Sequence, residues 1–218
     1  MTNITYGVWK FLDNNPCIRK NMEQGLLNMR ALAKYIIKYG KFDATLDAVI
    51  SALRRYEIDE HDKIFVVANE MLSRTINLST RSGLVELSLV KETEVQRLLP
   101  DLFGLIQYAR GNILRVMQAS ETLRILIDEK NLEEVKALFP KDKILTVDKK
   151  FAEINMYIHP EMQVTPGVLA VITNELAVNG INIREVMTCS PEILWFVREE
   201  DLLNAYHVLY QLCRFTKS

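Results

Sequence analysis

The chain has 218 residues, of which 49% are hydrophobic and 25% charged, and its formal net charge is −1. These values are ordinary for a folded soluble protein of one large domain or two to three small ones, and they exclude a strongly basic chain. The apolar runs are short and interrupted, so we expect no transmembrane segment. The N-terminal residues lack the pattern of a signal peptide, and we therefore expect a cytoplasmic protein without membrane contact.

The three cysteines, Cys17, Cys189 and Cys213, are odd in number and far apart in the sequence. This spacing argues against a disulfide framework and offers no pair for a zinc site. Cys189 has two interpretations, a reactive thiol or a buried small hydrophobic residue, and we favour the buried residue.

His61, His159 and His207 are isolated from any Ser, Cys or acid in a catalytic order, and we interpret them as structural or surface residues. The sequence has neither a phosphate-binding G-x-x-x-x-G-K motif nor a dinucleotide-binding G-x-G-x-x-G motif. We therefore expect a protein without catalytic residues, metal or cofactor, which is not an enzyme.

Residues 1–72 predict a helical domain. Val8, Phe11 and Leu12 recur at helical spacing, and Pro16 suits the first turn of a second helix. A helix is expected over 26–39 with a stop at Gly40. The further helices are expected over 43–57, with Asp43 as N-cap, and over 61–72, with an apolar stripe at Ile64, Val67, Ala68 and Met71.

The order of helix 26–39, a short break and helix 43–57 resembles the helix-turn-helix of winged-helix proteins, in which the second helix reads DNA. Residues 1–82 hold 12 Lys or Arg against 9 Asp or Glu, which permits such a role. The open alternative is a helical dimerisation or docking module. The candidate DNA contacts are Arg30, Lys34, Ser51, Arg54 and Arg55.

Beyond residue 73 the hydrophobic period changes to that of strands, and the expected order is β-α-β-β-α-β. Such a unit closes into an antiparallel sheet with helices on one face, the ferredoxin-like arrangement. Its elements are expected at 84–90, 94–110, 113–118, 122–127, 132–139 and 143–147, with a turn at Ser82-Gly83 after a short strand at 75–79.

The same order then recurs. A strand at 151–158 leads through Pro166-Gly167 into a helix that ends at Asn179-Gly180. Two further strands are expected at 181–188 and 193–197, separated by a turn at 190–192, before a last helix that Asp201 caps.

The segment PGVLAVITNELAVNGINI at 166–183 resembles the signature of ACT domains, especially the tandem pair in the regulatory region of aspartate kinases. The resemblance covers 151–213, is weaker over 84–148 and is absent over 1–72. It implies an α+β protein in which the helical, winged-helix-like domain is followed by two ferredoxin-like βαββαβ ACT domains. The expected domains are 1–72, 73–148 and 149–218, the last completed by strand 74–80, which should pair with the second sheet.

The resemblance also implies a small-molecule effector, most often an amino acid. Because such sheets and exposed edges tend to pair, we also expect a homodimer. A helix start with free backbone N–H groups favours a carboxylate, and Gly167 allows close approach to the main chain. The expected effector-binding residues are Thr165, Pro166, Gly167, Val168, Leu169, Asn179, Gly180, Ile181 and Asn182. The alternative is that Pro-Gly and Asn-Gly are simple turn residues in a structural module that binds no ligand and docks on a metabolic enzyme.

The first copy departs from this pattern. Glu92 and Glu94 stand where the Pro-Gly turn is expected and would repel a carboxylate. We therefore expect a complete effector site in the second copy only. The leading hypothesis is a regulatory protein whose tandem ACT domains sense a small molecule and signal through the helical head, with DNA as one candidate target.

Overall fold

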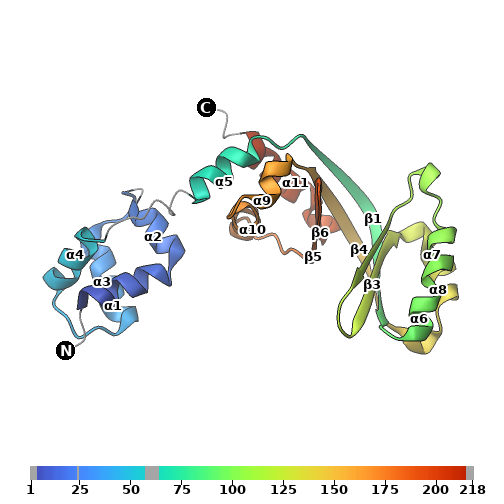
Figure 1. Cartoon of the computed structure of the whole chain (residues 1–218), viewed down its shortest axis with the longest axis horizontal. Coiled ribbons are helices and arrows are strands. Elements are labelled where there is room, and N and C mark those ends of the chain that lie inside the picture. Colours follow the sequence, from blue (N-terminus) through green and yellow to red (C-terminus); the bar gives the residue numbers. More distant parts are fainter. Residues whose placement is uncertain (1–3, 24, 57–63, 215–218) are drawn as a thin grey trace. The chain divides into compact units, whose positions relative to one another are not determined.

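The computed structural model describes residues 4–23, 25–56 and 64–214 (Figure 1). The chain divides into two compact units, Met1–Ile64 and Phe65–Ser218. No helix in the described ranges is long and apolar enough to cross a membrane.

The first unit is built from helices in its described residues. Their apolar faces enclose one core whose fully buried members include Val8, Ile36 and Leu53. The Trp9 indole N–H also donates to the Ala52 carbonyl at 3.0 Å, which ties the first helix to the fourth. The helices are α1 (Ile4–Asp13), α2 (Pro16–Glu23), α3 (Met29–Gly40) and α4 (Leu46–Arg54).

Two helix starts differ from the sequence prediction. Helix α3 begins at Met29 rather than at residue 26, because the Asn28 side chain accepts from the backbone N–H of Arg30 and Ala31. Helix α4 is capped by Thr45, and the prediction of Asp43 was wrong. Lys41, which follows α3, adopts a left-handed backbone conformation and turns the chain away from the helix. The residue that then lies in position to cap α4 is Thr45, two residues after Asp43.

Helix α5 (Ile64–Leu72) contributes to the core of the second unit. Ala68 and Leu72 are fully buried there, whereas Ile64 and Val67 are exposed. The predicted apolar stripe is therefore only partly correct. A helix with apolar residues on several sides does not by itself reveal which side is covered.

The second unit contains one antiparallel sheet with the strand order β2-β3-β1-β4-β6-β5. Figure 1 shows its two long strands running from the helices α9–α11 to the helices α6–α8. The strands are β1 (Asn77–Val90), β2 (Leu114–Gln118), β3 (Thr122–Asp128), β4 (Ile144–Tyr157), β5 (Glu185–Cys189) and β6 (Glu192–Arg198).

The long strands β1 and β4 correct the sequence prediction, which expected two shorter strands in place of each. Ser82-Gly83 forms a bulge with Gly83 at φ +69°, not a turn between strands. Lys150 adopts φ +63° where β4 also shifts register. Each strand thus gains one residue at this point. The positions that face the helices therefore change parity along β1, from Leu78 before the bulge to Val85 and Leu87 after it.

Each half of the sheet has the ferredoxin-like order. Residues 84–90 of β1 pair with β3, and residues 151–157 of β4 pair with β6. Asn77, Leu78 and Ser79 pair with Tyr157, Met156 and Asn155, so the upstream strand lies in the half that contains β6, as expected. The two halves therefore share β1 and β4 as common strands.

The helices of this unit and strand β5 lie close to the predicted positions, with four differences. Pro100 divides the helix expected over 94–110 into α6 and α7, which Tyr108–Arg110 follow as a short 3-10 helix. Strand β5 begins at Glu185 rather than at 181, and Asp201 lies in a 3-10 turn instead of capping α11. The helices are α6 (Thr93–Arg97), α7 (Leu99–Leu105), α8 (Leu132–Leu138), α9 (Pro160–Val164), α10 (Val168–Val178) and α11 (Leu202–Arg214), of which the sequence analysis missed α9.

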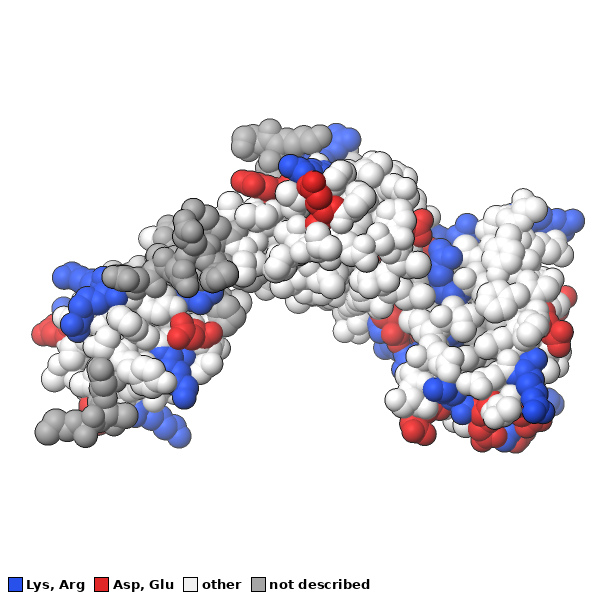
Figure 2. Space-filling view, viewed as in Figure 1, with Lys and Arg blue, Asp and Glu red and all other residues white. Residues whose placement is uncertain are grey.

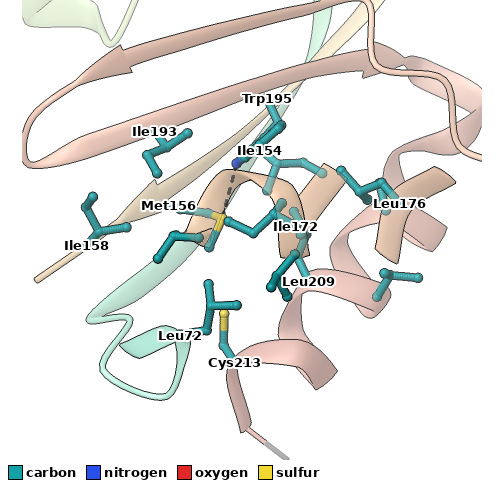
Figure 3. Packing of buried hydrophobic residues seen from close by; sticks show 14 of the residues in the cluster. Leu72, Ile154, Met156, Ile158, Ile172, Leu176, Ile193, Trp195, Leu209 and Cys213 are labelled. Atoms are coloured by element: carbon teal, nitrogen blue, oxygen red, sulfur yellow. Dashed lines mark hydrogen bonds between the residues drawn. The ribbon is translucent and has the colours of Figure 1, made fainter. Parts of the chain in front are cut away.

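Helices cover the two halves of the sheet with separate cores. Figure 3 shows the core beneath α5, α10 and α11, where the Trp195 indole N–H donates to the Met156 sulfur at 3.1 Å. A second core lies beneath α6, α7 and α8 and includes Leu87 and Ile125. These cores position α10 and its N-terminus over the β6 half of the sheet.

The opposite face of the sheet curls onto itself. It carries a third apolar cluster that contains no helix residue and includes Leu84, Phe151 and Phe196. The Arg115 guanidinium of β2 donates to both carboxylate oxygens of Glu153 on β4, at 3.0 and 3.1 Å, although two strands separate them in the sheet order. This contact requires the edge strand to bend back over the centre of the sheet.

Candidate functional site

A pocket of about 410 Å³ opens at the start of helix α10. It is lined by the first five of the predicted effector-binding residues, Thr165, Pro166, Gly167, Val168 and Leu169. The structure thus brings one half of the predicted site together around a single cavity.

The local sequence explains the shape of this corner. Helix α9 ends at Val164, and the Thr165 hydroxyl donates to the Glu161 carbonyl at 2.7 Å. Gly167 then caps α10 with φ +89°, a left-handed conformation that a residue with a Cβ adopts only at a cost. Pro166 removes a backbone donor just before the glycine.

The start of α10 has unused hydrogen-bonding capacity. Gly167 contributes no side chain to cap the helix, and its carbonyl accepts from the Val171 N–H at 2.9 Å. Among the described residues, no acceptor is found for the backbone N–H groups of Val168, Leu169 and Ala170. Free amides at the positive end of a helix dipole favour an anionic group such as a carboxylate.

The rest of the pocket is mostly apolar with a few hydroxyls. Buried Ile158, Met162 and Ile193 form its inner part, and Thr188 and Ser190 lie at its edge. In the view of Figure 2, the surface over α10 is largely white. Charge lies nearby, because the Glu192 carboxylate lines the pocket and Glu161 of α9 forms an ion pair with Arg74 at 2.6 Å. The arrangement suits a ligand with one anionic group and an apolar portion.

The other predicted effector-binding residues, Asn179, Gly180, Ile181 and Asn182, follow the far end of α10 and do not line this pocket. A helix of 11 residues separates the two groups, which corresponds to roughly 16 Å along its axis. The Asn179 amide donates to the Glu175 carbonyl at 2.9 Å, and Ile181 is buried. These residues end the helix and are not brought to the pocket within one chain.

The pocket residues that come from other elements were not predicted from the sequence. Met162 belongs to the short helix α9, while Thr188, Ser190 and Glu192 belong to the β5–β6 hairpin. The turn signal at 190–192 was visible in the sequence, but only the pairing of β5 with β6 brings this turn beside Gly167.

The first half of the sheet has different chemistry at the corresponding corner. Glu92 stands before α6 without making a side-chain cap, and its carboxylate accepts from the Lys143 ammonium at 2.8 Å. This hydrogen bond raises the pKa of the Lys143 ammonium. The corner therefore already carries a carboxylate, as its sequence indicated.

The five candidate DNA contacts lie on two helices of the first unit. Arg30 and Lys34 are exposed on α3, and Ser51 and Arg54 are exposed on the second half of α4. Arg55 follows α4 and donates to the Ser51 carbonyl at 3.2 Å and to the Thr5 hydroxyl at 3.3 Å. Asp47 occupies the first turn of α4, the part that reads bases in a helix-turn-helix.

Cys17 and Cys189 are exposed and Cys213 is buried, so the interpretation of Cys189 as a buried residue was wrong. Burial raises the pKa of the Cys213 thiol. His159 accepts from the Glu161 N–H and His207 contacts Gln211, whereas His61 lies outside the described residues. In those residues, no three His, Cys, Asp or Glu side chains gather where they could hold a metal ion.

No protein-family model matches the sequence, and a search of curated proteins gives no match. Solved structures do resemble it. The ligand-free regulatory subunit of aspartate kinase from Thermus thermophilus aligns with a TM-score of 0.53 and 13% identity, over 64% of this chain and 98% of that one. A structure of aspartokinase alpha and beta subunits aligns with a TM-score of 0.51 and 15% identity, over 63% of this chain and 97% of that one.

The aspartate kinase of Clostridium acetobutylicum aligns with a TM-score of 0.50 and 16% identity over 63% of this chain, which spans 35% of that enzyme's length. At such identities the likeness concerns the fold. The chain therefore has the α+β, ACT-like fold of aspartokinase regulatory regions, as the resemblance in 166–183 implied.

Proposed function

We propose that this protein is a non-enzymatic regulator that binds a small molecule, with an amino acid as the expected class, in the pocket at the start of α10. The observation that carries the proposal is the cavity of about 410 Å³ bordered by unpaired amides of Val168, Leu169 and Ala170. Its volume is within the range of small-molecule sites. The likeness in fold to a regulatory subunit of aspartate kinase supports a regulatory role.

In this proposal the helix amides bind the ligand carboxylate, and the apolar inner part receives its side chain. The residues expected to act are Thr165, Pro166, Gly167, Val168 and Leu169. Asn179, Gly180, Ile181 and Asn182 remain proposed contacts from a second copy, because the pocket of one chain does not include them.

A thermal-shift screen of the full chain against the twenty amino acids tests the proposal. A ligand that binds only the folded state raises the melting temperature. At a free ligand concentration of 100 times Kd, binding adds about 2.7 kcal/mol to the free energy of unfolding. We expect one or a few amino acids to raise it. If none does, the alternative of a structural module that docks on a metabolic enzyme is favoured.

The substitution Leu169→Asp assigns the binding to this pocket. Leu169 is 44% exposed, lines the pocket and is the second residue of α10, where a carboxylate stabilises the helix but repels an anionic ligand. We expect a loss of affinity of at least tenfold. The matched control is Leu203→Asp, because Leu203 is 81% exposed and is the second residue of α11, outside the pocket. If both variants lose affinity for the ligand equally, the ligand binds outside this pocket.

We also infer that the protein forms homodimers through its sheet edges. In the described sheet, β2 pairs only with β3 and β5 only with β6, so each leaves one edge without a partner. Free strand edges readily pair with another chain. Sedimentation velocity at micromolar concentration tests this inference, and a monomer throughout contradicts it.

The proposed output element is the helical first unit, and DNA stays a prediction for its target. Electrostatic DNA binding through Arg30, Lys34, Ser51, Arg54 and Arg55 requires an affinity that falls steeply with salt. A gel-shift series at 50 to 200 mM salt measures it. If no salt-sensitive binding is seen at micromolar protein, the prediction that the first unit binds DNA is contradicted.

A further inference from the structure

The first unit carries an apolar groove between α2 and α3 that the small-molecule pocket does not explain. The groove has a volume of about 340 Å³ and is lined by Ile18, Leu27, Asn28, Ala31, Leu32 and Tyr35. Leu26, next to it in the chain, is 67% exposed. Leaving such apolar surface in water is unfavourable, so an apolar groove of this kind marks a binding surface.

An aromatic row extends the groove along α3. Tyr35 is 44% exposed and Tyr39 is 58% exposed, and their ring centroids lie 4.4 Å apart. Phe11 of α1 packs edge-on against Tyr35 at 6.4 Å. Rigid aromatic rings that are already packed lose little side-chain entropy on binding, which makes them suitable anchors for a partner.

Cations line the adjacent row of the same helix. Arg30, Lys34 and Lys38 recur every four residues and are exposed, and exposed Lys41 follows at the helix end. The sequence has no Asp or Glu between residues 25 and 42. No ion pair involving these four side chains is found within the described part of the chain, and Lys38 lies 5.2 Å from the Tyr39 ring.

We propose that this face of α3 binds an amphipathic helix of a partner protein that carries acidic residues beside its apolar stripe. The apolar groove receives the stripe, and the row of Arg30, Lys34 and Lys38 pairs with the acids. The groove lies between two helices and offers no free strand edge, so a helix fits it better than an extended peptide. Duplex DNA presents phosphates and polar base edges, which leave the apolar floor unsatisfied.

The test uses the full chain and a displayed library of random 16-residue peptides. We expect selected peptides to have apolar residues at i, i+3 or i+4 and i+7, with Asp or Glu between them. Fluorescence anisotropy then measures the Kd of a selected peptide for the wild type and three variants, each checked by circular dichroism for retained folding.

The first variant is Ala31→Glu, which places a charge in the groove. Ala31 is exposed and lies at the third position of α3, where Glu is favourable beside the Asn28 cap, so the helix should be preserved. We expect at least a tenfold rise in Kd. The second variant combines Lys34→Glu and Lys38→Glu, for which we expect at least a tenfold rise and a weaker dependence on salt.

The matched control is Lys10→Glu, which reverses an exposed cation on α1 outside the groove and should change Kd by less than twofold. The proposal is overturned if the selection returns no acidic amphipathic peptides, or if such peptides bind Ala31→Glu as well as the wild type. It is also overturned if a 20-base-pair duplex binds more tightly than any peptide and loses affinity on charge reversal at Lys34 and Lys38. None of these outcomes depends on whether an amino acid binds at α10.

Discussion

Glu86 lies in the middle of β1 with only 6% of its surface exposed. Its Oε2 atom is buried and has no hydrogen-bond partner in the described residues, although the Arg124 guanidinium lies 3.7 Å away. Burial raises the pKa of the Glu86 carboxyl, and the positive charge of Arg124 opposes this rise only in part. The charged form of this residue therefore costs stability in the folded state.

The sign of the pH dependence follows from this raised pKa. Between the ordinary Glu pKa and the raised folded value, the folded state binds more protons than the unfolded chain, so the free energy of unfolding falls as pH rises. For Glu86→Gln we expect a gain of roughly 1 kcal/mol at pH 8, the scale of one unsatisfied buried group. Urea unfolding from pH 4 to pH 8 measures it, and a gain that is constant with pH contradicts the assignment.

At the scale of elements, strand β2 is held in place by a contact far from its neighbour β3. Glu153 is 4% exposed and receives two hydrogen bonds from Arg115 across the curled face. Removal of one partner of such a buried pair strongly lowers the free energy of unfolding, because the remaining charge stays buried without a counter-charge. We therefore expect the curl of the sheet to depend on that pairing.

We expect Arg115→Gln to lower the free energy of unfolding by about 3 kcal/mol, because Glu153 stays buried and loses its partner. The double variant Arg115→Gln with Glu153→Gln should recover most of this loss. Chemical denaturation of the wild type, both single variants and the double variant gives the coupling energy. Additive losses would show that the contact does not hold the edge strand.

At the scale of the second unit, the two halves of the sheet share β1 and β4 and meet at Phe151. This residue is fully buried in the third cluster beside Leu84 of β1 and Phe196 of β6. The guanidinium groups of Arg184 and Arg198 lie 5.5 and 5.3 Å from its ring. Because both shared strands pass this point, we expect the halves to unfold together.

The substitution Phe151→Leu tests this cooperativity. Lost ring volume and lost cation–π contacts should cost about 1–3 kcal/mol. Hydrogen exchange followed by mass spectrometry should then show faster exchange in both β3 and β6. Faster exchange in β6 alone would mean that the halves open independently, and exposed Val178→Ala serves as the control.

The effector pocket depends both on local sequence and on contacts between distant parts of the chain. Pro166 and Gly167 predict a turn before a helix, and in the structure Gly167 is left-handed at the start of α10. The segment before this turn is helix α9 and not the predicted strand. The hairpin residues Thr188 and Ser190 reach this corner only through pairing of β5 with β6. A single sequence indicates that a turn exists but not what it will face.

What the sequence determined by itself is the set of features that depend on near neighbours along the chain. Helix 168–178 ends at Asn179-Gly180, and the alternation over 151–158 predicts a strand with one buried face, since helical and strand periods are local properties. Tertiary structure alone decided that bulges at Gly83 and Lys150 join the expected short strands into two long ones. It also decided that α5 buries Ala68 and exposes Val67, because both outcomes depend on surfaces supplied by distant residues.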